Sequence, residues 1–169
     1  MRPIILFLSA PMLAACATPM EHAAPDGSTA TLVDGSGRAV GTVSIEADPG
    51  HATLGLTATG LAPGEHGVHL HAVGRCDGPG FQSAGAHWNP ANRKHGILNP
   101  EGAHMGDLPN LTAGADGKAM ATLHVGGGPL TDTDGTSLVI HAKPDDNKTD
   151  PSGNSGDRIA CAVIAAPQP

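Results

Sequence analysis

Short runs of alternating apolar and polar residues recur along most of the chain. They cover residues 28–34, 38–47, 51–60, 66–74, 107–113, 118–125, 137–142 and 158–166. An alternation with a period of two is typical of β-strands, and no long window after the N-terminus has the helical period. The segments "DGSG" and "GADG" each separate two of these runs, which predicts two hairpins. We therefore predict an all-β protein, an antiparallel sandwich or barrel of eight strands.

Two long segments interrupt this pattern. Residues 74–106 and 143–157 are rich in Gly, Pro, Asn and Asp and have little strand character. Loops of this length are uncommon in compact domains and usually functional. With 2% aromatic residues, the core must consist of Val, Ile, Leu and Ala. The formal charge of −7 and the lack of a basic stripe argue against nucleic acid as a partner.

The N-terminus has the features of a processing segment. One Arg precedes an apolar stretch over residues 4–15, which is too short to span a bilayer and is typical of a signal peptide, here residues 1–15. "LAAC" resembles the bacterial lipobox, so Cys16 would be lipidated; ordinary cleavage, with Cys16 incidental, is the alternative. Residues 16–28 would then be the lipidated N-terminus and a tether, and residues 29–169 the domain. Lipidation of Cys16 leaves Cys76 and Cys161 as one pair in an oxidising compartment.

The histidines are the candidate chemistry. His69 and His71 are two residues apart on a predicted strand, so their side chains share a face. His66 is odd-spaced from them, and we expect it to be a structural, hydrogen-bonded residue. Alone, the His69–His71 pair is weak evidence, because a pair facing solvent would look the same.

A metal site becomes the better interpretation once the long loop is included. Residues 74–106 contain three histidines, His87, His95 and His104, and Asp107 follows directly after this segment. Loop histidines are usually solvated, and His141 at the end of an apolar strand could be an ordinary buried polar residue. Two four-coordinate sites need eight ligands, and the seven candidates would suffice if one imidazole were shared. Imidazole-only ligation suits copper or zinc, and three His with one Asp suit zinc.

At this point the residues resemble a known family, the copper–zinc superoxide dismutases of the bacterial exported type. The resemblance covers about residues 28–165 and rests on "HGVHLH", "GAHWNP", "HMGDLPN", "VIHAKPDD" and "GDRIACAVI", in the family's order. It implies an eight-stranded Greek-key β-barrel with two long functional loops. That this family is a β-sandwich, with electrostatic steering of its substrate, is general knowledge of the family.

The resemblance implies one copper and one zinc per chain. Copper would be held by His69, His71, His87 and His141. Zinc would be held by His87, His95, His104 and Asp107, so that His87 is a bridging imidazolate. Asp145 would link ligands of the two metals and fix their orientation. Cys76 and Cys161 would form the disulfide that ties the long loop to the last strand.

The implied activity is the conversion of superoxide to oxygen and hydrogen peroxide by cycling between Cu(II) and Cu(I). His87 would take up a proton when copper is reduced, and Arg158 would guide the anion. Because the chain is net negative, the local field of Arg158, Lys143 and Lys148 must outweigh the global charge. Asp157 could pair with Arg158 and weaken this steering.

Two other functions compete with this one. A non-catalytic copper- and zinc-binding lipoprotein on the same fold is the first, but the chain keeps every copper candidate and Arg158. A zinc hydrolase is the second, and it would need an open zinc position and a general base. The four zinc candidates instead fill the coordination sphere.

The resemblance also bears on location and assembly. We expect the protein to be in the bacterial periplasm, with a lipid anchor as its only membrane attachment. We expect this anchor in the outer membrane, because Ala17 follows Cys16 where an Asp usually marks retention in the inner membrane. Residues 76–87 differ from the form found in eukaryotic members, where this region helps to form the dimer. A homodimer of this chain would therefore use a different interface. Ala142 stands where the family often has Glu.

Overall fold

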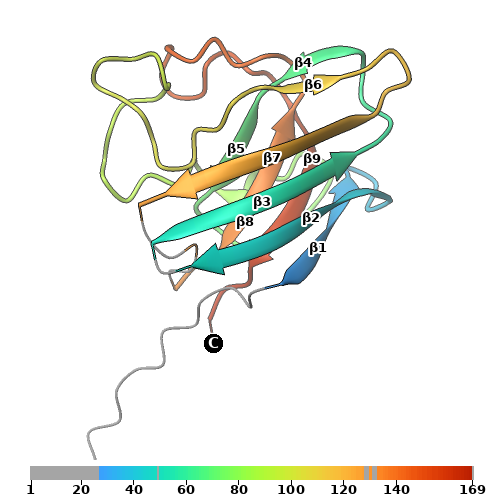
Figure 1. The fold of residues 1–169 in the computed structure, drawn as a ribbon, viewed down its shortest axis with the longest axis horizontal. Helices are drawn as coiled ribbons and strands as arrows, with labels where there is room; N and C mark the ends of the chain where they lie inside the picture. The colour runs from blue at the N-terminus through green and yellow to red at the C-terminus, as the bar shows by residue number, and fades with distance from the viewer. Residues whose placement is uncertain (1–26, 49, 128–129, 131–132, 169) are drawn as a thin grey trace, which may run out of the picture.

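The computed structural model describes residues 27–48, 50–127, 130 and 133–168 (Figure 1). The predicted signal peptide, Cys16 and nearly all of the tether lie outside these residues. The described part of the chain contains nine β-strands and one short 3₁₀ helix, η1 (Gln82–Ala84). No helix in this part is long and apolar enough to cross a membrane.

Seven strands form one antiparallel sheet that curls into two layers. Their order is β5-β8-β9-β1-β2-β3-β7, and β4 and β6 form a separate two-stranded sheet. In Figure 1, β1, β2, β3 and β7 lie in front, and β5, β8 and β9 lie behind them. The strands are β1 (Ser28–Asp34), β2 (Ala39–Asp48), β3 (His51–Ala58), β4 (Gly64–His66), β5 (Val68–His71), β6 (Leu111–Ala113), β7 (Ala119–Gly126), β8 (Thr136–His141) and β9 (Arg158–Ala165).

The core lies between the two layers. The front layer contributes alternate residues such as Val43, Ile45 and Leu54, and the rear layer contributes Leu70 and Leu138, all of them almost completely buried. The intervening residues of β2, β3 and β7 face outward and are mostly more exposed. This alternation is the cause of the period-two pattern in the sequence. The prediction of an all-β antiparallel fold is confirmed.

One predicted strand is two strands in the structure. The run over residues 66–74 breaks at Gly67, so that β4 pairs with β6 and β5 pairs with β8. A Cβ at Gly67 would lie 2.9 Å from the Cβ of Ser155, so the loop before β9 packs directly against this break. Nine strands are therefore present where eight were predicted.

The two predicted hairpins differ in outcome. β1 and β2 form an antiparallel ladder across "DGSG", as predicted. The segment after β6 does make a tight turn, in which the Gly114 N–H donates to the Lys118 carbonyl. However, β6 pairs with β4 and β7 pairs with β3, so this turn carries the chain from one sheet to the other.

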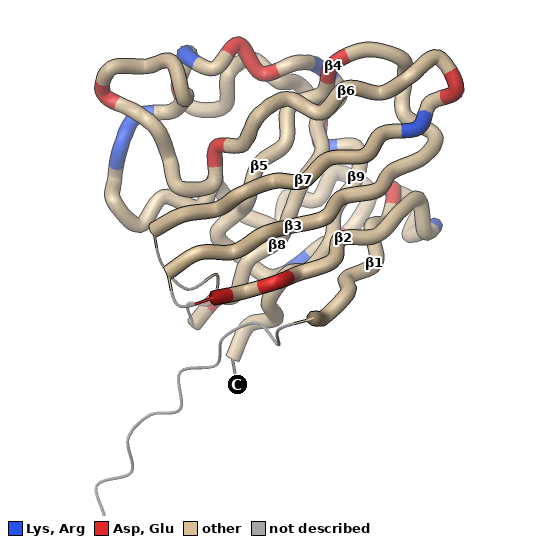
Figure 2. Tube along the Cα trace, in the orientation of Figure 1, with Lys and Arg blue, Asp and Glu red and all other residues tan. Residues whose placement is uncertain are grey.

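The long loops cover the outer face of the rear layer. β8 is buried along its whole length because its inner face meets the core and its outer face meets the loop after β5. There Val139 packs with Phe81, Ala84 and Cys161. The disulfide between Cys76 and Cys161 joins this loop to β9. Figure 2 shows that most charged residues lie on loops and strand ends, whereas the centre of the front sheet is uncharged.

Candidate metal centre

The candidate ligands lie on the outer face of the rear layer, under the loops. His69 and His71 alternate on β5 with the core residues Val68 and Leu70, and His141 ends the adjacent β8. β5 is an edge strand, and the long loop covers this edge. Isolated bridges pair His71 with His87 and His69 with Asp107. The edge pairing therefore brings loop residues from two distant places beside the strand histidines.

The first group of ligands consists of four buried imidazoles. His69, His71, His87 and His141 can each offer a ring nitrogen so that all four atoms lie within 4.8 Å of one another. His69 Nδ1 and the Nε2 atoms of the other three are buried and have no hydrogen-bond partner among the described residues. Four converging nitrogen lone pairs that accept no hydrogen bond are costly in a protein interior.

The other ring nitrogens explain why three of these four atoms present lone pairs. His71 Nδ1 donates to the Gly85 carbonyl at 2.9 Å, and His141 Nδ1 donates to the Gly156 carbonyl at 3.1 Å. His69 Nε2 donates to Asp145 Oδ2 at 2.7 Å. Each of these bonds fixes the tautomer, so the remaining nitrogen is an acceptor. The donor set fits a cation that prefers imidazole, such as copper.

The second group surrounds the carboxylate of Asp107. The Nδ1 atoms of His87 and His95 lie 3.0 Å from Asp107 Oδ1, and that of His104 lies 3.2 Å from it. Asp107 Oδ2 accepts the backbone N–H groups of Gly96 and His104. Three imidazole nitrogens and one carboxylate oxygen at this spacing suit zinc.

The structure brings His69 near this second group as well. His69, His87, His95 and Asp107 have possible ligand atoms within 4.8 Å of one another, a set that contains His69 in place of His104. His69 Nε2 is already bonded to Asp145, and its Nδ1 belongs to the four unpaired nitrogens. His104 Nδ1, by contrast, lies 3.4 Å from His87 Nδ1. We therefore favour His104 for the second group.

Asp145 connects the two groups. Its Oδ2 accepts from His69 Nε2, and its Oδ1 accepts from His95 Nε2 at 3.0 Å. Asn110 fixes the backbone of Asp145 through two reciprocal hydrogen bonds, from its Nδ2 to the Asp145 carbonyl and from the Asp145 N–H to its Oδ1, both at 2.9 Å. Asn110 ends the segment "HMGDLPN", but the sequence alone assigned it no role, because its partner is the backbone of Asp145.

The environment keeps most of the imidazoles neutral. Burial lowers the pKa of His71 to about 2, of His141 to about 3 and of His87 to about 4. His69 is also lowered in pKa, again because of burial. Neutral imidazoles are the form that binds metals.

His95 is the exception. Burial acts to lower its pKa, but hydrogen bonds to Asp107 and Asp145 outweigh burial and raise the pKa of His95 to about 9. Burial would raise the pKa of both aspartates, yet their hydrogen bonds with histidines hold each pKa well below its usual value. Without a metal, His95 therefore carries a proton between two carboxylates.

A cavity of about 320 Å³ opens beside the first group. Its lining includes His87, His141, Pro151, Ser152 and Arg158. The Arg158 guanidinium donates to the carbonyls of Phe81 at 2.8 Å and Gly85 at 2.7 Å. It thus bonds to the loop, and no ion pair with its neighbour Asp157 occurs in the described part of the chain. The cavity combines a fixed cation with two candidate ligands.

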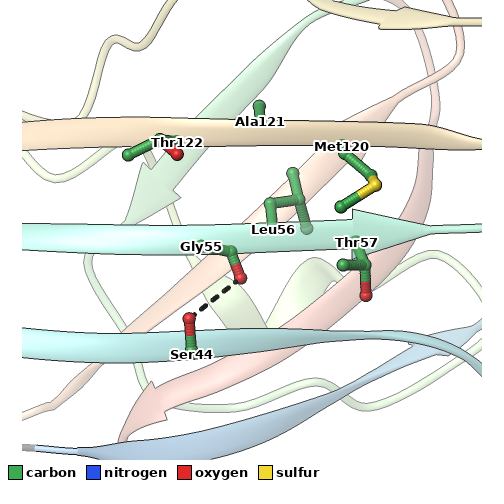
Figure 3. A pocket seen from close by; sticks show the side chains of 7 residues that line it. All are labelled: Ser44, Gly55, Leu56, Thr57, Met120, Ala121 and Thr122. Carbon is green, nitrogen blue, oxygen red and sulfur yellow. Dashed lines mark hydrogen bonds between the residues drawn. The ribbon is translucent and has the colours of Figure 1, made fainter.

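A second hollow, of about 350 Å³, lies on the outer face of β2, β3 and β7 (Figure 3). Gly55 pairs with Ser44 on β2 and with Thr122 on β7, and the Ser44 hydroxyl donates to the Gly55 carbonyl at 3.4 Å. The described residues that line it are small or apolar, and none is charged. It has no groups for acid–base or metal chemistry.

His66 behaves as predicted. It is buried, and its ring nitrogens lie 2.7 Å from the His141 carbonyl oxygen and 2.8 Å from that of Ala62. Neither metal group contains it. His51 and His124 are exposed on the front sheet. Trp88, next to His87, is part of the core.

The fold and the two adjoining ligand groups define a dinuclear metalloprotein built on an antiparallel β-barrel. Residues 39–164 match the family model for copper/zinc superoxide dismutase (SODC), and the chain belongs to this family. It is 45% identical over 146 residues to a superoxide dismutase [Cu-Zn] from Caulobacter vibrioides, covering 80% of this chain and 84% of the relative. It is 42% identical to a superoxide dismutase-like protein from Bacillus subtilis, covering 79% of this chain and 73% of that protein.

Solved structures agree with this assignment. A SOD-like protein from Bacillus subtilis matches with a TM-score of 0.74 and 40% identity, over 80% of this chain and 97% of the other. A Cu/Zn superoxide dismutase from Brucella abortus matches with a TM-score of 0.66 and 36% identity, over 81% of this chain and 98% of the other.

Proposed function

We propose that this protein is a superoxide dismutase that converts superoxide to oxygen and hydrogen peroxide with one copper and one zinc per chain. The observation that carries the proposal is the set of four buried, unpaired imidazole nitrogens beside a cavity that contains a fixed arginine. Copper, when bound, supplies the reversible one-electron step that dismutation requires and that zinc cannot supply.

The ligand assignment follows from the lone pairs. Copper would be held by His69 Nδ1 and by the Nε2 atoms of His71, His87 and His141. Zinc would be held by the Nδ1 atoms of His87, His95 and His104 together with Asp107 Oδ1. His87 is the only residue in both sets, and its two ring nitrogens face different groups. The contacts of Asp145 with His69 and His95 keep both rings in orientation.

Residues of the cavity act on the substrate and on protons. The two carbonyl bonds of Arg158 hold its guanidinium at the cavity wall, where it attracts and orients a small anion. Peroxide formation also requires protons. His87 lines the cavity, and its Nε2, which has no hydrogen-bond partner among the described residues, could take up a proton there and donate it to the substrate. Lys143 and Lys148, both exposed on the loop before β9, add to the local positive field.

A non-catalytic metal-binding protein on the same fold is the less favoured function. Such a protein needs the ligands but has no use for a cation fixed at the cavity wall. The two carbonyl bonds to Arg158 therefore favour the enzyme.

Export is part of the proposal. The disulfide between Cys76 and Cys161 supports an oxidising compartment such as the bacterial periplasm. Lipidation of Cys16 and anchoring to the outer membrane remain predictions, because Cys16 lies outside the described residues. Mass spectrometry of the mature N-terminus tests them, and an unmodified N-terminus would exclude the anchor. We also expect any homodimer to use an interface unlike that of the eukaryotic type, which sedimentation of loop variants can test.

The deciding experiment measures superoxide dismutation by the mature protein reloaded with copper and zinc, beside a His141→Ala variant. We expect the parent protein to dismutate superoxide rapidly and the variant to lose this activity, because the substitution removes the His141 imidazole, one of the four proposed copper ligands. The variant's zinc content, measured in parallel, should be unchanged, since His141 lies outside the zinc set. Stoichiometric binding of both metals by the parent protein with no dismutation would reject the enzyme in favour of a metal carrier.

A further inference from the structure

The two long loops are joined by hydrogen bonds outside the metal centre. The Leu98 N–H donates to the Asn147 carbonyl at 3.1 Å. Asn99 Nδ2 donates both to the His95 carbonyl at 3.0 Å and to the Lys148 carbonyl at 3.2 Å. The segment that carries His95 is therefore attached along its length to the loop before β9.

Asp150 makes the strongest of these connections. Its Oδ1 accepts the backbone N–H of His95 at 2.6 Å, and its Oδ2 pairs with Lys94 Nζ at 3.1 Å. A charged acceptor makes shorter and stronger hydrogen bonds than a neutral one.

The residues that follow Asp150 form part of the cavity wall. Pro151 and Ser152 line the cavity together with His141 and Arg158. A turn fixes their position, because the Gly153 N–H donates to the Thr149 carbonyl at 2.7 Å. Asp150 thus lies between a zinc candidate and the entrance through which substrate must pass.

We propose that Asp150 is a positioning residue that couples the zinc ligand loop to the wall of the substrate cavity. Through its bond to the His95 N–H, it sets where Pro151 and Ser152 stand relative to Arg158. Occupancy of the zinc site and the affinity of the cavity for small anions are therefore linked. This inference rests on the proposed function, since it takes the cavity to be the anion site.

The test compares Asp150→Ala with Asp150→Asn, Lys94→Met and a matched control, Asp116→Ala. Asp116 is an exposed aspartate that likewise accepts a backbone N–H, that of Lys118 at 3.1 Å, and pairs with the Lys118 ammonium at 3.3 Å. It is located on the turn before β7 and does not line the cavity. Two quantities are measured on the copper- and zinc-loaded proteins: zinc release to a competing chelator, and the dissociation constant of azide from the copper absorption spectrum.

We expect Asp150→Ala to weaken zinc binding by about 10-fold, at the low end for loss of a partner behind a ligand. Azide binding should weaken several-fold in the same variant. Asp150→Asn keeps an oxygen for the His95 N–H and should recover most of both losses. Lys94→Met and Asp116→Ala should stay within twofold of the parent.

Weakened zinc binding with unchanged azide affinity would overturn the coupling, because it would limit Asp150 to the zinc loop. Equal losses in Asp116→Ala would show a general effect on stability and would also overturn it. If Asp150→Ala does not fold, Asp150→Asn decides the question: any residual loss should appear in zinc binding and azide binding together, and a loss in only one of them would overturn the coupling. Dismutation by the parent protein is measured separately: its absence would reject the proposed function, whereas the zinc and azide data would still decide the coupling.

Discussion

The disulfide between Cys76 and Cys161 offers a prediction whose magnitude follows from the structure. The two cysteines are separated by 85 residues, so the bond closes most of the domain into one loop. The chain-entropy relation for a loop of this length gives about 4.6 kcal/mol of stabilisation through the unfolded state. Because unfolded chains retain some structure, this figure is an upper estimate. We expect the double variant Cys76→Ala, Cys161→Ala to lose about 2–4 kcal/mol.

The assay is urea unfolding of the metal-free protein, so that metal release does not add to the free energy of unfolding. The parent protein in the presence of a reductant should match the double variant, because both lack the cross-link. A loss below about 1 kcal/mol, with an unchanged denaturant slope, would refute the reasoning from loop length.

The same variant should also affect the cavity. The disulfide holds the loop whose carbonyls, at Phe81 and Gly85, bind Arg158. Gly85 also accepts from His71 Nδ1, so displacement of this loop disturbs a copper candidate and the arginine together. We expect weaker azide binding in the metal-loaded double variant. Unchanged azide binding would show that packing of Phe81 alone suffices to hold the loop.

Three further predictions concern protons and charge. The metal-free protein should be most stable near pH 6.5. Below this pH, His71 and His141 become protonated in the unfolded state but stay neutral in the folded state, where their pKa values are about 2 and about 3, so stability falls. Above it, stability falls because the stabilisation from protonated His95 is lost as the pH rises through its folded pKa of about 9. Urea unfolding at pH 5, 6.5 and 9 checks this, and a stability that rises steadily from pH 5 to 9 would contradict it. Zinc binding to the metal-free protein should release about one proton at pH 7, because the metal replaces the proton on His95, and calorimetry in buffers of different ionisation enthalpy measures it; no release would mean that His95 is neutral. Arg158→Ala should lower kcat/KM by about 10-fold or more and weaken its salt dependence, whereas the exposed Arg38→Ala should change neither; equal effects in both variants would argue against a local field.

Side-chain spacing predicted the geometry of only one pair of candidate ligands, and the complete ligand sets were implied by the resemblance to the family. His69 and His71 share a face because strand residues alternate, and the structure places both on the outer face of β5. His87 and Asp107 could be recognised as candidates from their loop. These two residues lie beside β5 because the long loop pairs with the free edge of that strand, through bridges between residues far apart in the sequence. No local pattern in the sequence reports such a pairing.

The contacts that the sequence did not predict mostly involve the backbone. The Gly85 carbonyl accepts from both His71 and Arg158, and the amide of His95 donates to Asp150. Every residue has a carbonyl and nearly every residue has an N–H, so these groups leave no trace in the residue types. Asn110 is similar, because its partner is the backbone of Asp145.

Gly67 has two structural roles that the alternating pattern does not predict: its backbone forms hydrogen bonds to two other segments, and its lack of a side chain lets the loop before β9 come close. Its backbone bonds join it to two neighbours, since its N–H donates to the Lys143 carbonyl and its own carbonyl accepts from the His141 N–H. A Cβ here would lie 2.9 Å from the Ser155 Cβ and 3.4 Å from the Asp145 Cβ. A glycine inside a strand usually weakens it but permits close approach of another backbone segment.

That close approach is what the metal centre requires. The loop before β9 must come near β5 for the Asp145 carboxylate to reach His69 Nε2 at 2.7 Å and His95 Nε2 at 3.0 Å. A Cβ at Gly67 would lie too close to the Ser155 Cβ, so a side chain here would displace this loop. The break between β4 and β5 at Gly67 therefore lets one carboxylate form hydrogen bonds with a candidate ligand from each group.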